Sequence, residues 1–165
     1  MKRILILGAP GSGKSFLTRE LAQKLSLPAY HLDYFFYKPN WQEVGQEKFA
    51  QKQREIIIKE HWIIDGNSVR MLHERLKRAD AVIFLDVPLM RRLIRIVKRD
   101  IFTKNIHMPT GCSFSWKQFF SFLKNHVLFW NKKDTILSII ALYPHISFFH
   151  LCSPDELKKF LQKVK

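Results

Sequence analysis

Hydrophobic residues occur along the chain in short runs that alternate with longer stretches of helical periodicity. The run ILIL at residues 4–7 leads directly into a glycine-rich segment, and the next twelve residues, KSFLTRELAQKL, place Leu17, Leu21 and Leu25 four positions apart. A short apolar, β-branched run is typical of a buried parallel strand, and a four-residue spacing is typical of an amphipathic helix. The N-terminal 25 residues therefore predict a strand, a loop and a helix.

The same alternation continues to the end of the chain. It predicts four further strands, near Ala29–Leu32, Trp62–Ile64, Ala81–Leu85 and Ile146–Leu151. The sequence Ser153-Pro154-Asp155-Glu156 is a capping box with proline at the first helical position, which predicts a last helix over Pro154–Leu161. Because no linker, repeat or low-complexity segment interrupts the pattern, residues 1–165 predict a single doubly wound α/β domain.

The glycine-rich segment GAPGSGKS, residues 8–15, matches the P-loop pattern. Its position between a strand and a helix favours a phosphate-binding loop over a simple glycine turn, because backbone N–H groups and the helix start then surround a phosphate. We expect Lys14 to reach the outer phosphates of ATP and Ser15 to hold Mg²⁺. The predicted nucleotide-binding residues are Gly8, Ala9, Pro10, Gly11, Ser12, Gly13, Lys14, Ser15 and Phe16.

Three predicted strands end in an aspartate, and ligands of open parallel sheets bind at the carboxyl ends of the strands. Asp65 precedes Gly66 and Asn67, which predicts a sharp turn that directs its carboxylate toward the P-loop. It is therefore the favoured Mg²⁺ ligand, acting through water, with a turn residue as the alternative. Asp86 also ends a hydrophobic strand and is either the metal carboxylate or a structural residue before the next helix. Asp33 is positioned to orient or deprotonate an attacking hydroxyl, unless it only lies in a surface turn, and the nearby His31 is more typical of a packed side chain.

Charge is the unusual feature of the composition. The chain has 28 Lys and Arg against 14 Asp and Glu, and residues 91–133 hold ten basic residues and a single acid, Asp100. A helix beginning near Pro88 carries Arg91, Arg92, Arg95, Lys98 and Arg99 on one arc, and its four arginines favour a phosphate clamp over a solvated charged face. The opposite arc predicts a packed apolar face made of Leu89, Leu93, Ile94, Ile96, Val97 and Ile101.

Other classes of protein receive less support from the sequence. The aromatic stripe in residues 116–130 favours packing against the domain over a helix lying on a membrane surface, and no apolar run approaches the roughly 20 residues that a membrane span needs. Cys112 and Cys152 have no metal-ligand spacing and are interpreted as reduced thiols. We expect a cytoplasmic protein without membrane partners, a monomer with a homodimer left open.

The chain resembles adenylate-kinase-related P-loop proteins of the DNA topology modulation group, nearly from end to end. The resemblance is carried by GAPGSGKS, HLDYFFYKPNW, WIIDGN, RLKRADAVIFLDVP, RRLIRIVKR and the dipeptide Gly111-Cys112. It departs from the group's pattern at Ser68, where an aromatic is expected, after Gly111-Cys112, where an acid is expected, and at Lys132 and Lys133, where arginines are expected.

This resemblance implies a three-layer nucleoside-monophosphate-kinase-like fold with a central five-stranded parallel sheet and a helical lid. It implies an acceptor-binding region at about residues 33–60 and a lid at about 91–133. The implied acceptor-site residues are Asp33, Trp41, Asp65, Gly66, Asn67, Arg70 and Arg75, and Arg91, Arg95 and Arg99 would clamp the donor phosphates.

Together these features predict an ATP- and Mg²⁺-dependent phosphotransferase with an unidentified acceptor. Lys14, Asp33, Arg95 and Arg99 would carry the catalysis, by positioning and charge neutralisation. Two alternatives stay open: a nucleic-acid-binding or DNA-topology-modulating protein with regulatory nucleotide binding, and a kinase acting on a nucleic-acid end. The net charge of +14 is compatible with both.

Overall fold

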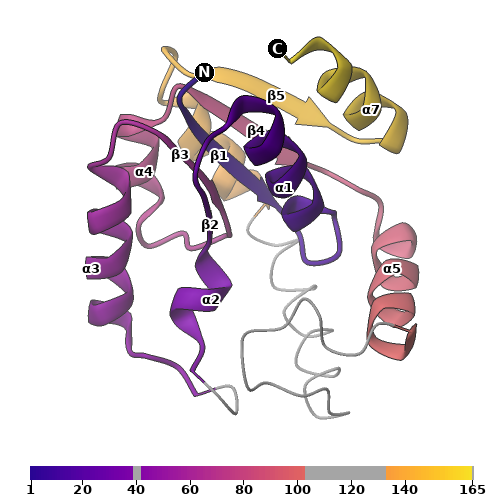
Figure 1. Ribbon diagram of the computed structural model, residues 1–165, viewed down its shortest axis with the longest axis horizontal. Helices are drawn as coiled ribbons and strands as arrows, with labels where there is room; N and C mark the ends of the chain where they lie inside the picture. Colours follow the sequence, from indigo (N-terminus) through magenta and orange to yellow (C-terminus); the bar gives the residue numbers. More distant parts are fainter. Residues whose placement is uncertain (39–41, 103–132, 165) are drawn as a thin grey trace.

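A computed structural model describes residues 1–38, 42–102 and 133–164, without the side chains of residues 97 and 99–102. Five parallel strands form one sheet: β1 (Arg3–Gly8), β2 (Ala29–His31), β3 (Trp62–Asp65), β4 (Ala81–Leu85) and β5 (Ser147–Leu151). Their order is β2-β3-β1-β4-β5, so β1 lies at the centre and β2 and β5 at the edges (Figure 1). The five strands predicted from the sequence are confirmed.

The helices are α1 (Lys14–Leu25), α2 (Leu32–Phe36), α3 (Gln46–Ile57), α4 (Leu72–Arg78), α5 (Leu89–Phe102) and α7 (Pro154–Lys163), and residues 133–141 are also helical. The predicted cap of α7 is present, because the Ser153 hydroxyl accepts the N–H of Glu156 at 3.2 Å. Glu156 in turn accepts the backbone N–H of Cys152 at 2.7 Å, which fixes the chain between β5 and α7.

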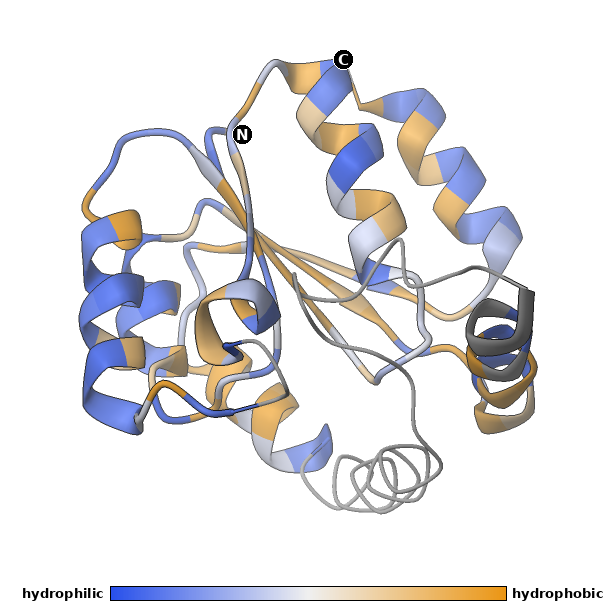
Figure 2. Ribbon diagram, turned by 60° about the horizontal axis from the view of Figure 1, so that its bottom comes forward, coloured by the Kyte–Doolittle hydropathy of each residue, from blue (hydrophilic) through white to orange (hydrophobic). Residues whose placement is uncertain are grey.

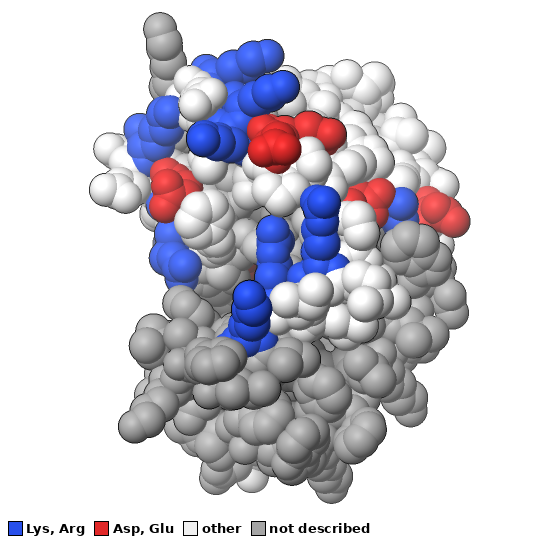
Figure 3. All heavy atoms as spheres, turned by 90° about the vertical axis from the view of Figure 1, so that its right-hand side faces the viewer, with Lys and Arg blue, Asp and Glu red and all other residues white. Residues whose placement is uncertain are grey.

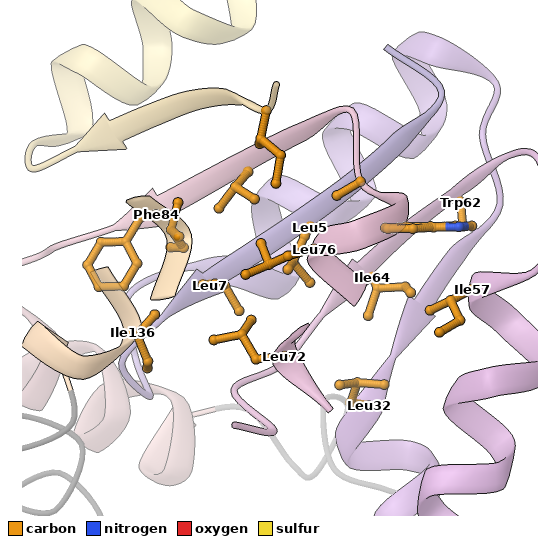
Figure 4. Packing of buried hydrophobic residues seen from close by; sticks show 14 of the residues in the cluster. Leu5, Leu7, Leu32, Ile57, Trp62, Ile64, Leu72, Leu76, Phe84 and Ile136 are labelled. Atoms are coloured by element: carbon orange, nitrogen blue, oxygen red, sulfur yellow. The ribbon is translucent and has the colours of Figure 1, made fainter. Parts of the chain in front are cut away.

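Two apolar layers enclose the sheet. On one face Leu17 and Leu21 of α1 and Phe160 of α7 pack against alternate residues of the strands. On the other face α3, α4 and the 133–141 helix cover the sheet, and Figure 4 shows Leu7, Phe84 and Ile136 converging there. The hydropathy colouring in Figure 2 shows the apolar strands in the middle and polar surfaces on the flanking helices. This is the predicted three-layer α/β architecture.

The register of the strands aligns their carboxyl ends. His31 pairs with Asp65, Gly8 with Leu85, and Leu85 with Leu151. The segments that follow the strands therefore emerge at one edge of the sheet, where ligands of open parallel sheets bind.

Candidate functional site

The loop between β1 and α1 has the geometry of a phosphate-binding loop. Its three glycines, Gly8, Gly11 and Gly13, all have positive φ, and α1 begins directly after the third of them. The ammonium of Lys14 folds back over the loop and donates to the carbonyl oxygens of Gly8 at 2.8 Å and Ala9 at 3.2 Å. Ser15 and Phe16 are exposed at the first turn of α1. The loop therefore combines a fixed backbone, a helix N-terminus and a cation, the combination that binds phosphates.

Asn67 holds the first residue of this loop. Its side-chain Oδ1 accepts the N–H of Gly8 at 3.1 Å and its Nδ2 donates to the Gly8 carbonyl at 2.6 Å. The sequence assigned Asn67 to the acceptor site, whereas these contacts make it a support of the P-loop. An acceptor contact by Asn67 stays a prediction.

Asp65 lies at the end of β3 and is almost completely buried, with 4% of its surface exposed. Its Oδ2 lies 2.8 Å from Nδ1 of His31 and 3.1 Å from Oγ1 of Thr18, and the same Thr18 hydroxyl lies 2.9 Å from the Lys14 carbonyl. The carboxylate thus connects β2, β3 and α1 at the point where α1 leaves the P-loop. His31, expected from the sequence to be a packed side chain, is a direct partner of the predicted metal ligand.

Mg²⁺ prefers oxygen donors, usually one or two protein ligands together with water. The exposed hydroxyl of Ser15 and the carboxylate of Asp65 supply donors of this kind. Oδ2 of Asp65 is already engaged by His31 and Thr18. Asp65 is therefore better suited to contact Mg²⁺ through a bridging water than directly.

Helix α5 contacts the P-loop through its basic side. Nη1 of Arg95 donates to the Ser12 carbonyl at 3.1 Å, and Arg92 is only 1% exposed. Burial lowers the pKa of Arg92, and the nearby Asp86 opposes that shift. Arg91 is exposed, and the side chain of Arg99 lies outside the described residues. Figure 3 shows this side of the molecule, with Lys and Arg side chains distributed over the surface near α5 and α7.

The predicted packing of α5 is wrong for part of its apolar arc. Ile96 is buried as predicted, but Leu89 and Ile94 are about half exposed, and Arg92 from the predicted outer arc is buried. The helix approaches the P-loop so closely that a Cβ on Gly11 would lie 2.9 Å from the Arg92 carbonyl and from Cγ1 of Ile96. The side of α5 that carries Arg92 and Ile96 therefore faces the loop.

The other predicted acceptor residues come from several elements. Arg75 on α4 is fully buried and donates from Nη1 to the Gly66 carbonyl at 3.0 Å and from Nη2 to the Ser68 carbonyl. Burial lowers the pKa of Arg75 to about 9. Arg70 is exposed, and its Nη2 lies 3.8 Å from Oε2 of Glu47. Asp33 is exposed on α2. Trp41 lies outside the described residues, as does most of the predicted lid.

Asp86 belongs to a second group of polar side chains, at the ends of β4 and β5. Its Oδ2 accepts from Nζ of Lys133 at 2.6 Å and lies 3.1 Å from Nε2 of His150. Burial acts to raise the pKa of Asp86, but the hydrogen bonds from Lys133 and His150 outweigh it and hold the pKa below its ordinary value. Burial and the neighbouring carboxylates of Asp86 and Glu156 raise the pKa of the Cys152 thiol.

The sequence indicated where these groups lie but not what they contact. Thr18 was missed, although its position four residues after Lys14 on α1 was a usable signal. The burial of Arg75 and Arg92 was not predicted. The carbonyls that Arg75 contacts lie only nine and seven residues earlier, but the turn after β3 is needed to bring them within its reach. Arg92 is buried where α5 meets the P-loop. Among the described residues, no helix has the length and apolarity needed to cross a bilayer.

Comparison with known proteins supports the fold. No family model matches the chain. Threonine synthase-like 1 of Mus musculus is 25% identical over 98% of this chain, which spans only about a quarter, 26%, of that protein. A shikimate kinase of Clostridium botulinum is 26% identical, covering 83% of this chain and 87% of the kinase. The crystal structure of shikimate kinase from Bacteroides thetaiotaomicron matches with a TM-score of 0.59 at 17% identity, over 98% of this chain and 95% of the kinase.

The chain therefore has the three-layer α/β fold of P-loop kinases, similar to that of shikimate kinases. Membership of the DNA topology modulation group stays a prediction from sequence motifs.

Proposed function

We propose that the protein is a P-loop phosphotransferase that moves the γ-phosphoryl group of ATP to a hydroxyl group of a small molecule. The observation that carries the proposal is the convergence of two cations on one glycine loop: Lys14 from α1 and Arg95 from α5 both donate to its carbonyl oxygens. Two cations on a loop that also presents a helix N-terminus form a site for a polyanion. The likeness to shikimate kinases, whose name specifies a small hydroxylated acceptor, supports the choice of class.

In the proposed reaction the acceptor oxygen attacks the γ-phosphorus. A new P–O bond forms, the bond from the γ-phosphorus to the bridging oxygen breaks, and ADP leaves. Lys14 and Arg95 would neutralise charge on the phosphates, and Arg91 and Arg99 are proposed to extend that clamp along α5. Asp33 would take the proton of the acceptor hydroxyl. Ser15 and Asp65 would hold Mg²⁺, which when bound would neutralise charge on the transferred group.

The supports of this site have distinct proposed roles. Asn67 fixes Gly8 at the start of the P-loop, and Arg75 fixes the carbonyls of Gly66 and Ser68 in the turn after β3. Such fixed backbone groups matter because phosphoryl transfer depends on alignment and electrostatics more than on covalent chemistry. We propose Trp41, Gly66 and Arg70 as further acceptor contacts.

The acceptor can be identified by measuring ADP release from Mg·ATP with a panel of nucleosides, nucleotides, sugars and small alcohols that includes shikimate. The proposal predicts that at least one hydroxyl compound raises ADP release above the rate with water alone and becomes phosphorylated. Phosphorylated product should be absent with a Lys14→Ala variant. Equal ADP release with every compound and no phosphorylated product would contradict the proposed function.

A second candidate is a nucleic-acid-binding protein or a nucleic-acid-end kinase, favoured by the net charge of +14. Binding to the phosphate backbone of a nucleic acid weakens as the salt concentration rises. For each phosphate contacted, the affinity falls roughly tenfold for a tenfold rise in salt concentration. Measuring the affinity for single-stranded and duplex DNA from low to moderate salt tests this candidate. Tight binding with a steep slope, together with phosphorylation of a DNA end but of no small molecule, would favour it over a small-molecule kinase.

A further inference from the structure

Three metal-ligating side chains meet at the ends of the two neighbouring strands β4 and β5. A carboxylate oxygen of Asp86, a ring nitrogen of His150 and Sγ of Cys152 all lie within 4.8 Å of one another. The arrangement follows from the sheet, because Leu85 pairs with Leu151, so that Asp86 and Cys152 leave the two strands side by side. His150 and Cys152 are two positions apart, the spacing that places side chains on the same face of an extended chain.

The cluster is held in place by contacts that do not involve a metal. The backbone N–H of Cys152 donates to Glu156 at 2.7 Å as part of the cap of α7. The imidazole of His150 contacts the rings of Phe84 and Phe148, with centroids 5.6 and 6.1 Å away. Cys152 and His150 are therefore oriented by neighbouring elements while remaining exposed enough for an ion to enter.

The donor set selects the class of metal. A carboxylate, an imidazole and a thiolate together suit Zn²⁺ and similar first-row ions, whereas Mg²⁺ and Ca²⁺ prefer oxygen donors. Ligand atoms around one tetrahedral zinc are about 3.3–3.8 Å apart, given bond lengths of about 2.0–2.3 Å. The distance of 3.1 Å between Asp86 and His150 is already close to this range, so small side-chain rotations would complete the site.

We propose that Asp86, His150 and Cys152 form a binding site for a divalent metal of the zinc class, with three protein ligands and a further position open. The site is separate from the proposed Mg²⁺ ligands Ser15 and Asp65, and it does not depend on the phosphotransferase function. Metal binding would displace a proton from the Cys152 thiol.

Lys133 competes with such a metal. Its ammonium lies 2.6 Å from the same Asp86 oxygen that His150 approaches, and two cations cannot occupy that position together. A bound metal would therefore release Lys133 from Asp86. Because Gly8 of the P-loop pairs with Leu85 just before Asp86, this exchange would take place beside the nucleotide loop.

The test uses Co²⁺ as a spectroscopic probe and Zn²⁺ in calorimetric titrations of the full chain. We expect Co²⁺ to produce a thiolate-to-metal charge-transfer band and Zn²⁺ to displace it. Cys152→Ser and His150→Gln should each lower Zn²⁺ affinity by at least about tenfold, since loss of even an outer-shell partner costs about 10- to 100-fold. Lys133→Ala should raise Zn²⁺ affinity, because it removes the competing charge.

Two matched controls separate this site from adventitious binding. Cys112→Ser removes the chain's other cysteine, and His61→Gln removes an exposed histidine that lies outside the cluster. Both variants should retain the Co²⁺ charge-transfer band and the Zn²⁺ affinity of the wild type. Circular dichroism should show that every variant is folded. A band that disappears in Cys112→Ser but persists in Cys152→Ser would overturn the proposal. So would the absence of a band, or Zn²⁺ affinity that is unchanged in His150→Gln and Lys133→Ala.

Discussion

At the scale of single residues, Asp65 is the last residue of β3 and Asp86 directly follows β4, and the two carboxylates have different partners. Asp65 contacts His31 and Thr18 beside the start of α1, whereas Asp86 contacts Lys133 and His150 toward the β5 edge. We predict that Asp65→Asn lowers the Mg²⁺-dependent rate several-fold to many-fold, and that Asp86→Asn lowers it less. Steady-state rates at saturating Mg·ATP measure both variants. If folded Asp86→Asn loses more of the Mg²⁺-dependent rate than Asp65→Asn does, the metal role belongs to Asp86 and not to Asp65.

Asp80 makes a residue-scale contribution to stability that depends on pH. Burial acts to raise its pKa, but hydrogen bonds from Arg3, at 2.6 and 3.1 Å, and from the backbone N–H groups of Lys2 and Arg3 hold the pKa below its ordinary value. A carboxyl with a lowered folded-state pKa stabilises the protein above its unfolded pKa, about 3.9, and this contribution disappears as pH falls through the folded pKa.

We therefore predict that Asp80→Asn lowers the free energy of unfolding at neutral pH and that the difference from wild type shrinks at strongly acidic pH. Urea unfolding from pH 7 down to pH 3 measures it. The exposed Asp155 on α7 supplies a control, Asp155→Asn, for a general change in net charge. If the difference in free energy of unfolding between wild type and Asp80→Asn grows as the pH falls, the ion pair between Asp80 and Arg3 is contradicted.

At the scale of elements, α5 is the arm that brings cationic groups to the P-loop. Arg95 contacts Ser12, while Lys98 on the same helix is exposed. We predict that Arg95→Ala lowers turnover by about 100-fold or more, because a preorganised cation near transferred charge has effects of that size. Lys98→Ala removes the same charge from the same helix and should have little effect. Equal rates for the two variants would contradict a clamp centred on Arg95.

The junction between α5 and the P-loop also depends on Gly11. Gly11 and Gly45 both have positive φ, of +75° and +88°, but a Cβ on Gly11 would meet Arg92 and Ile96 at 2.9 Å whereas a Cβ on Gly45 would meet nothing within 4 Å. Backbone strain alone costs about 1–3 kcal/mol.

We predict that Gly45→Ala costs an amount within that range and that Gly11→Ala costs more, since it adds a clash with α5 to the strain. Chemical denaturation of both variants measures the difference. If Gly11→Ala is no more destabilising than Gly45→Ala, the close approach of α5 to the loop is incorrect.

At the scale of the whole molecule, the positions of the strands were predictable because most are short apolar runs and each is closely followed by a glycine, an aspartate or a capping box. Asp65 and the P-loop were predictable for the same reason, since a strand end specifies where the next residues emerge. The partners of Asn67 and Arg75 were not predictable, because both contact backbone groups that only the folded turns bring near. The burial of Arg92 was not predictable either, because it departs from the predicted basic face of its helix.

The net charge of the whole molecule also predicts only part of the function. The sequence gives +14 and its concentration in residues 91–133, but one net charge is compatible with a nucleotide site and with a nucleic-acid surface. Arg95 donates to the Ser12 carbonyl of the P-loop, and this contact favours the nucleotide site.

The most direct measurement of the central claim is calorimetric titration of Mg·ATP into the wild type, Lys14→Ala and Lys48→Ala. Lys48 is an exposed lysine on α3 and controls for loss of one positive charge. If the glycine loop is a nucleotide site, the wild type and Lys48→Ala bind Mg·ATP with similar affinity, whereas binding by Lys14→Ala is abolished or severely weakened. Equal affinity in all three proteins would show that ATP binds elsewhere or without the loop, and would contradict the account.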